Sequence, residues 1–212
     1  MKSLFTFIAL FIFILTSTTS IGQTSEVKNV KKSFDKYKYA ILNDKGKDAV
    51  QYVDSKTIKY YNEILELIKS ADSVKLESLS LTDKLMVLII RHRTPKKEIL
   101  SFDGTMLLIY SIDNGMVGKQ GTANNSIGEV IIEDNFAKGQ LLVRGEKTPV
   151  YFHFNKESEQ WKIDLTALFE LSDMVFKSMI KDSELSDNDF IFSILENING
   201  KRPGKEIWNK VE

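Results

Sequence analysis

The side chains best suited to acid–base chemistry lie on a strand that we predict over residues 148–155. His153 and Tyr151 share one side of this strand, because side chains alternate along a strand. An imidazole titrates near neutral pH, so His153 could act as a general base or bind a ligand. The sequence places no partner at a catalytic spacing, and we therefore favour a half-buried histidine that faces another structural element.

Asp164 is the next candidate, because it lies at the end of a predicted strand just ahead of a predicted helix. A carboxylate beside a pocket could abstract a proton if burial raised its pKa. An acid at a helix N-terminus also accepts backbone N–H bonds and suits the helix dipole, and we favour this capping role. We assign no catalytic residue. The candidate surface for a ligand or partner comprises Tyr151, His153, Arg144 and Asp164.

The sharpest cluster of charge is the sequence RHRTPKK at residues 91–97. This cluster could bind an anion or an acidic partner. A solvated helix end is the simpler interpretation, since cations are favoured at a helix C-terminus. The whole chain has 29 basic and 29 acidic residues, and no aromatic side chains interleave with the cluster, so we expect no nucleic-acid partner.

Motifs for metal or cofactor chemistry are missing from the sequence. It has no HExxH motif, no cysteine and no acidic loop with calcium-site spacing, so we expect no metal. It has no GxSxG motif, Walker loop or dinucleotide-binding glycine pattern, so we expect no cofactor. The missing cysteine also excludes disulfides, thiolate zinc sites and a lipid-anchored N-terminus.

Apolar spacing predicts helices in the first half of the chain. Positions 27, 30, 34, 37 and 41 form one helical face, which Gly46 ends, and Asp54 is placed to cap a second helix. Residues 73–79 alternate weakly and predict an edge strand. Ser80 begins a further helix that stops before Pro95. We expect residues 106–110 to be buried, residues 113–115 to form a turn, and Gly118 and Gly121 to lie in a loop.

The second half predicts an antiparallel meander followed by helices. Short runs rich in β-branched and aromatic residues cover 127–132, 137–144, 148–155 and 160–165, and their short connections join antiparallel neighbours. Val150, Phe152 and Phe154 should pack on the helices. The face that carries His153 should be covered at least partly by the C-terminal helices, a second copy or a partner.

Two helices should follow the meander. Thr166 begins one with apolar positions 168, 171, 175 and 179, and Ser186 begins another that Gly200 ends ahead of an apolar tail. The predicted fold class is α+β, with N-terminal helices packed on a curved antiparallel sheet and extra helices over about 166–212.

This order of elements resembles the nuclear transport factor two-like superfamily of cone-shaped α+β folds. The local similarity is PVYFHF at residues 149–154, an acidic turn, and WKIDL at residues 161–165, which look like the last two strands of many exported bacterial members. The resemblance implies a bent sheet with a pocket against the helices. It implies no single activity, because relatives include isomerases, dehydratases, transport adaptors and proteins with no known activity.

The first 22 residues have the three-part pattern of a secretory signal. Lys2 precedes twelve uncharged residues (4–15), and small residues lead to Gly22. That stretch is shorter than the roughly 20 apolar residues that a membrane-spanning helix needs. We therefore expect cleavage after Gly22 and one exported α+β domain over residues 23–212. Loss of Lys2 lowers the 29 basic residues to 28 against 29 acidic ones, a formal charge of −1.

We interpret the mature chain as an exported, periplasmic or extracellular, non-catalytic binding domain for an unknown small molecule or protein, without a stable membrane anchor. One alternative is an isomerase or lyase with a small pocket, using Asp164, His153 or Tyr151. Another is an envelope module that binds or inhibits a protein, and a homodimer is among the arrangements we consider. A pocket with polar groups of perturbed pKa would favour the enzyme, whereas a flat apolar patch would favour a protein partner.

Overall fold

A helix over residues 24–42 begins the part of the chain that the computed structural model describes, which comprises residues 24–117 and 119–211. The expected export signal and its cut lie outside these residues. The apolar face predicted for helix 24–42 is its buried face. A turn at Asp44 follows, and Gly46 then begins the short helix α2 (Gly46–Ala49), which continues into the 3₁₀ turn η1 (Val50–Tyr52).

The two longest helices that follow begin and end where their capping residues predict. The Asp54 carboxylate accepts a 2.8 Å hydrogen bond from the Thr57 N–H and caps α3 (Ser55–Ser70). The Ser80 hydroxyl caps α5 (Leu81–Arg93), which ends two residues before Pro95. The apolar run at residues 85–90 is therefore helical, as predicted.

The predicted edge strand at residues 73–79 is wrong, because this segment forms the short helix α4 (Ser73–Glu77). The Asp72 carboxylate accepts a 2.9 Å hydrogen bond from the Lys75 N–H and caps it. Only Leu76 is buried, whereas Val74 is exposed, so no alternating face is covered. A local cap outweighs a weak alternation in a segment this short.

Residues 96–123 are more helical than the sequence predicts. They form α6 (Lys96–Ser101), α7 (Gly104–Asp113) and α8 (Lys119–Ala123), and residues 114–115 make the predicted turn. The Asp103 carboxylate caps α7 by accepting from the Met106 N–H. Because a helix has a period near 3.6 residues, Leu107 and Leu108 face the core, but Met106 is 51% exposed, contrary to the expected burial of the whole run 106–110.

The meander is confirmed as a four-stranded antiparallel sheet in the order β1-β2-β3-β4. Its inner face is apolar, with Phe152 and Phe154 buried as predicted, and the Phe34 ring lies 5.2 Å from the Phe152 ring. The register shifts between Ile127 and Val130 and between Gln140 and Leu142. The strands are β1 (Asn125–Glu133), β2 (Phe136–Val143), β3 (Glu146–Glu157) and β4 (Gln160–Asp164).

The C-terminal helices form as predicted but use a different face. After the 3₁₀ turn η2 (Leu165–Leu168), α9 (Phe169–Ser183) turns Phe176 and Ile180 toward the core and leaves Val175 and Met179 exposed. Ser186 caps α10 (Asp187–Asn199), Gly200 ends it with a φ of +68°, and the apolar tail docks through η3 (Lys205–Trp208), where Ile207 is buried.

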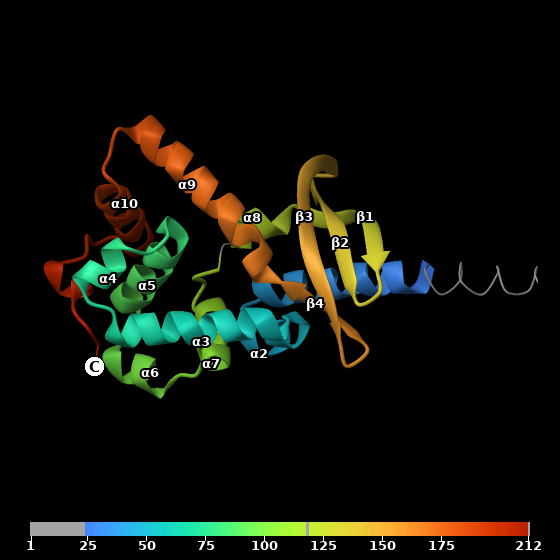
Figure 1. Ribbon diagram of the computed structural model, residues 1–212, viewed down its shortest axis with the longest axis horizontal. Coiled ribbons are helices and arrows are strands. Elements are labelled where there is room, and N and C mark those ends of the chain that lie inside the picture. Colours follow the sequence, from blue (N-terminus) through green and yellow to red (C-terminus); the bar gives the residue numbers. More distant parts are fainter. Residues whose placement is uncertain (1–23, 118, 212) are drawn as a thin grey trace, which may run out of the picture.

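The sheet lies at one end of the molecule and most helices gather at the other (Figure 1). Helix 24–42 crosses the inner face of the sheet, and α9 leaves the end of β4 and runs across to α10. Both C-terminal helices pack against α5. They therefore do not cover the outer face of the sheet, which was one of the arrangements that we expected. Within residues 24–117 and 119–211, no helix combines the length and apolar character needed to cross a membrane.

Candidate functional site

Tyr151 and His153 lie half-buried on the outer face of the sheet, on the same side of β3, as predicted. His153 pairs in register with Lys138 on one side and with Asp164 on the other. Its ring lies 5.2 Å from the Phe136 ring in an edge-to-face arrangement. Burial lowers the pKa of His153 below its usual 6.5, and the attraction of Asp164 only partly opposes this effect. The uncharged imidazole is therefore favoured.

Asp164 has the capping role that the sequence favours. Its carboxylate accepts hydrogen bonds from the Thr166 N–H at 2.9 Å and the Thr166 hydroxyl at 2.5 Å, at the start of η2. The Lys56 ammonium approaches to 2.8 Å. Burial opposes ionisation of Asp164, but the bonds from Lys56 and Thr166 outweigh it, and the pKa falls below its usual value. A proton-abstracting role would need the opposite shift.

The four residues of the predicted surface do not form one site. His153 and Asp164 are cross-strand neighbours, and Tyr151 lies two positions along the same face. Arg144 lies in the exposed turn between β2 and β3, with a left-handed φ of +53°, beyond the end of the pairing that joins Val143 to Glu146. The sheet therefore brings together three of the predicted residues, Tyr151, His153 and Asp164, and leaves Arg144 apart.

Arg91, the first residue of the basic cluster, is not part of a solvated helix end. Its guanidinium donates four hydrogen bonds to backbone carbonyls at the end of α3 and in the C-terminal tail. These bonds join the last turn of α5 to the end of α3 and to the C-terminal tail. The acceptors are Leu67, Ile68, Ala71 and Ile207.

A mainly apolar pocket of about 610 Å³, partly open to solvent, lies between the helices and the inner face of the sheet. Helix 24–42, α3, α5, β3 and α9 all contribute to its wall. A second cavity of about 150 Å³ continues behind Tyr61 and Met86. The aromatic and aliphatic wall residues of the larger cavity are Phe34, Tyr37, Tyr61, Leu85, Met86, Met116, Val117, Phe152, Leu165, Leu168, Phe169 and Phe176.

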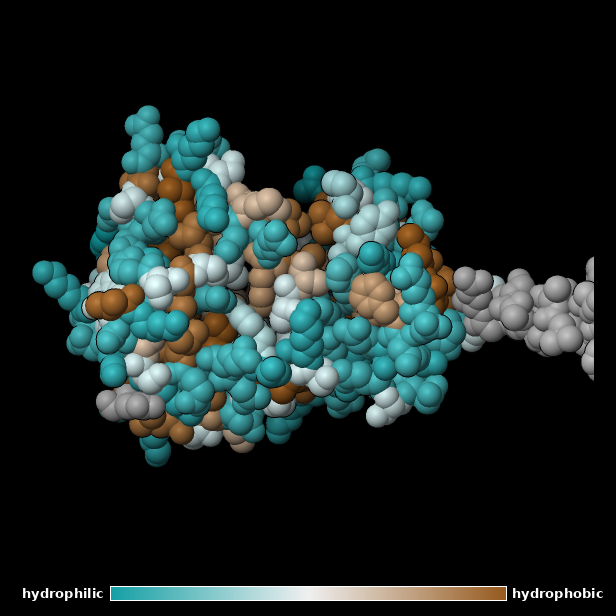
Figure 2. Space-filling view, viewed as in Figure 1, coloured by the Kyte–Doolittle hydropathy of each residue, from teal (hydrophilic) through white to brown (hydrophobic). Residues whose placement is uncertain are grey.

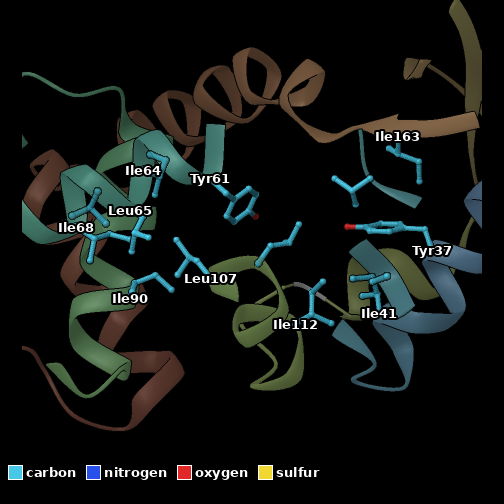
Figure 3. Packing of buried hydrophobic residues seen from close by; sticks show 14 of the residues in the cluster. Tyr37, Ile41, Tyr61, Ile64, Leu65, Ile68, Ile90, Leu107, Ile112 and Ile163 are labelled. Carbon is cyan, nitrogen blue, oxygen red and sulfur yellow. The ribbon is translucent and has the colours of Figure 1, made fainter. Parts of the chain in front are cut away.

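Two tyrosine hydroxyls are the main polar feature of this apolar cavity. Tyr37 comes from helix 24–42 and Tyr61 from α3, and their hydroxyls point toward one another across the core (Figure 3). Tyr37 is 6% exposed and Tyr61 is 7% exposed. No hydrogen bond joins either hydroxyl to another of the described residues. Buried tyrosine hydroxyls usually find a partner, so these two donors are available to a ligand.

The environment keeps both tyrosines protonated. Burial raises the pKa of Tyr61 to about 12. Burial, reinforced by the proximity of Tyr61, also raises the pKa of Tyr37 well above its usual value. Each hydroxyl can therefore donate one hydrogen bond and accept others at any physiological pH.

One side of the cavity is closed by the C-terminal helix α9. Its Asp173 carboxylate accepts from the Thr82 N–H at 2.8 Å and from the Thr82 hydroxyl at 2.5 Å, at the first turn of α5. The Phe169 ring lies 4.6 Å from the Tyr60 ring, whose hydroxyl donates to Asp83. Hydrophobic side chains are visible in the surface notch between α9 and the sheet (Figure 2). The C-terminal extension therefore forms a wall of the cavity and does not fill it.

The residues of this cavity were not among those predicted from the sequence to form a site. The available signal was a tyrosine on each of two otherwise apolar helical faces, at positions 37 and 61. The remaining polar wall residues are hydroxyl or amide side chains, and the described wall contains no acidic, basic or histidine side chain. Chemically, the arrangement can enclose an apolar group and hydrogen-bond one polar group of a ligand.

The fold and cavity define an α+β protein whose antiparallel meander and helices line a mainly apolar pocket. Comparison with protein-family models, with curated proteins and with solved structures finds no match to this chain.

Proposed function

We propose that this protein binds a small, largely apolar molecule that carries one hydrogen-bonding group. The observation that carries the proposal is the cavity of about 610 Å³ with two unpartnered tyrosine hydroxyls in a mainly apolar wall. Ligand pockets typically have volumes of about 300–1,000 Å³, with mainly hydrophobic walls and few polar groups that set orientation. Tyr37 and Tyr61 would hold the polar group, and the aromatic wall would enclose the rest.

Export and the superfamily resemblance belong to the same proposal. The signal pattern of residues 1–22 supports a role outside the cytoplasm, where a binding protein could hold an apolar molecule in water. A pocket between helices and a sheet suits a member of the nuclear transport factor two-like superfamily. The helix α4 lies where the sequence predicted an edge strand, so the order of elements matches the superfamily less well at this point.

The isomerase or lyase alternative has less support from the geometry. Tyr151, His153 and Asp164 lie on the outer face of the sheet, whereas their neighbour Phe152 lines the cavity on the inner face. The side chains with acid–base potential and the pocket are thus on opposite sides of one sheet. Binding in the cavity needs none of the three.

A second candidate function is association through the outer face of α9. Leu171, Met174, Val175 and Met179 are between 36% and 56% exposed along this helix. Burying apolar side chains of this kind against another chain is favourable. A second copy of this chain is the occupant that we propose, since closed homodimers are the commonest oligomers.

A displacement assay on the mature protein tests the binding proposal. The fluorescent probe N-phenyl-1-naphthylamine should bind in the cavity. 4-Hexylphenol should displace it at a lower concentration than hexylbenzene, which lacks the hydroxyl. One neutral hydrogen bond contributes about 0.5–1.5 kcal/mol, which is roughly a two- to twelvefold preference. The Tyr37→Phe/Tyr61→Phe double variant should lose this preference and still bind hexylbenzene.

A cavity-filling variant is the control for binding elsewhere. Ser172 lies on the cavity wall, and within the described residues its hydroxyl donates to the Leu168 carbonyl one turn earlier. Ser172→Phe should abolish probe binding while the melting temperature stays equal or rises. Unchanged probe binding in this variant, with the fold intact, would place the probe outside the cavity and contradict the proposal.

A further inference from the structure

A second hollow, of about 520 Å³, lies between the end of α5 and the C-terminal tail and shares no wall residue with the apolar cavity. Two segments that are far apart in the sequence form it, residues 91–99 and residues 201–211. Each segment contributes basic side chains, and Glu206 is the only acidic residue among its described wall residues. We call this space the basic hollow.

Backbone contacts hold the two walls of the basic hollow together. Arg91 donates to the Ile207 carbonyl at 3.1 Å, and the His92 ring nitrogen lies 3.2 Å from the Lys201 carbonyl. The Val211 N–H donates to the Lys69 carbonyl at 2.9 Å. The tail is therefore fixed against α3 and α5, so a ligand would not have to order it first.

Three cations on this wall are not neutralised by the protein. Arg202 pairs with Asp189 at 3.0 Å and with Glu196 at 3.5 Å. Within the described part of the chain, Lys96, Lys201 and Lys210 have no carboxylate at ion-pair distance. Like charges around one concave surface repel one another, and a bound anion would remove that cost.

Thr94 supplies an independent observation. It lies on the wall of the basic hollow and is 94% buried, yet its hydroxyl oxygen has no hydrogen-bond partner in the described residues. Buried polar atoms are almost always paired, and an exception usually indicates a missing water, ion or ligand atom. Thr94 and the three unpaired lysines thus line the same hollow.

We propose that the basic hollow binds a small polyanion that carries two or more phosphate or carboxylate groups. Lysine ammonium groups would neutralise the oxyanions, and the fixed tail would keep them in place. The site is separate from the apolar cavity, so it stands whether or not the cavity binds a ligand.

Titration calorimetry and amide NMR with pyrophosphate and with citrate test this proposal and distinguish the two kinds of oxyanion. We expect saturable binding of at least one of them, with shifts concentrated at residues 91–99 and 201–211. The triple variant Lys96→Gln/Lys201→Gln/Lys210→Gln should weaken that binding roughly tenfold or more. The three side chains are exposed, so the fold should be kept.

The matched control is Lys28→Gln/Lys36→Gln/Lys177→Gln, which removes three exposed lysines outside the basic hollow and changes the net charge equally. We expect it to bind the polyanion as the wild type does. Equal weakening in both triple variants, or shifts spread over all lysines, would show non-specific charge attraction and overturn the site. Absence of saturable binding by both anions would overturn it as well.

Discussion

Trp161 shows at the scale of one residue how the sheet is tied to helix 24–42. The ring is buried, its Nε1 donates a 2.6 Å hydrogen bond to Glu26, and its carbonyl accepts from the Ser33 hydroxyl at 2.5 Å. Removing such a ring costs about 3–5 kcal/mol, so we expect Trp161→Ala to lower the thermal midpoint sharply. Trp161→Phe keeps most of the packing and should lose less. An unchanged midpoint in Trp161→Ala would contradict this structural role.

His153 should make stability depend on pH in a known direction. Its pKa in the folded protein lies below the usual 6.5, so the unfolded chain takes up a proton first as the pH falls through 6.5. Unfolding is then favoured on acidification, and thermal melts between pH 7.5 and 5.5 should show a steeper loss for wild type than for His153→Gln. The pKa of Asp164 is also lowered, from 3.8, so its contribution is lost only at more acidic pH.

The opposite pH dependence of stability would mean that the pKa of His153 is raised, not lowered, in the folded protein. A wild type that becomes relatively more stable than His153→Gln on acidification would mean that Asp164 holds the imidazolium. We also expect His153→Gln to leave probe binding in the cavity unchanged, because the side chain lies on the other face of the sheet. A turnover that is lost in this variant, with fold and mass intact, would favour the enzyme alternative.

At the scale of elements, the contact between α7 and α3 depends on the absence of a side chain at Gly104. A Cβ there would lie 2.5 Å from the Asn62 backbone nitrogen, and the Gly104 N–H donates to the Asn62 side chain at 2.8 Å. Gly104→Ala should therefore push the helices apart and cost about 1–3 kcal/mol, measured by chemical denaturation.

Gly121→Ala is the matched control for this helix contact. Gly121 lies in α8, and a Cβ there would meet no atom within 4 Å. The same substitution should be neutral or stabilise by up to about 1 kcal/mol, since alanine loses less backbone entropy in a helix. Equal effects of the two substitutions would mean that α7 does not pack on α3 at this distance.

At the scale of the whole molecule, the exposed face of α9 predicts the oligomeric state. If a second copy covers it, light scattering should give twice the chain mass for wild type and a monomer for Val175→Lys. Val74→Lys places the same charge on an exposed valine of α4 and should leave the mass unchanged. A monomeric wild type at high concentration would contradict association through α9.

The sequence alone determined the features that depend on neighbouring residues. The caps at Asp54, Ser80 and Ser186, the left-handed end at Gly200 and the meander are confirmed, because each follows from backbone bonding or alternation within a few residues. Asp164 likewise caps the turn after β4, as the sequence favoured.

Only the tertiary structure decided which faces meet and what space lies between them. The alternation at residues 73–79 predicted a strand, but the segment forms a helix. The apolar spacing in α9 did not predict that Phe176 faces inward and Val175 outward. The apolar cavity depends on how side chains from residue 34 to residue 176 pack, and the basic hollow on how the tail returns to α5. Gaps between packed elements are set by long-range contacts, and no local pattern of residues encodes them.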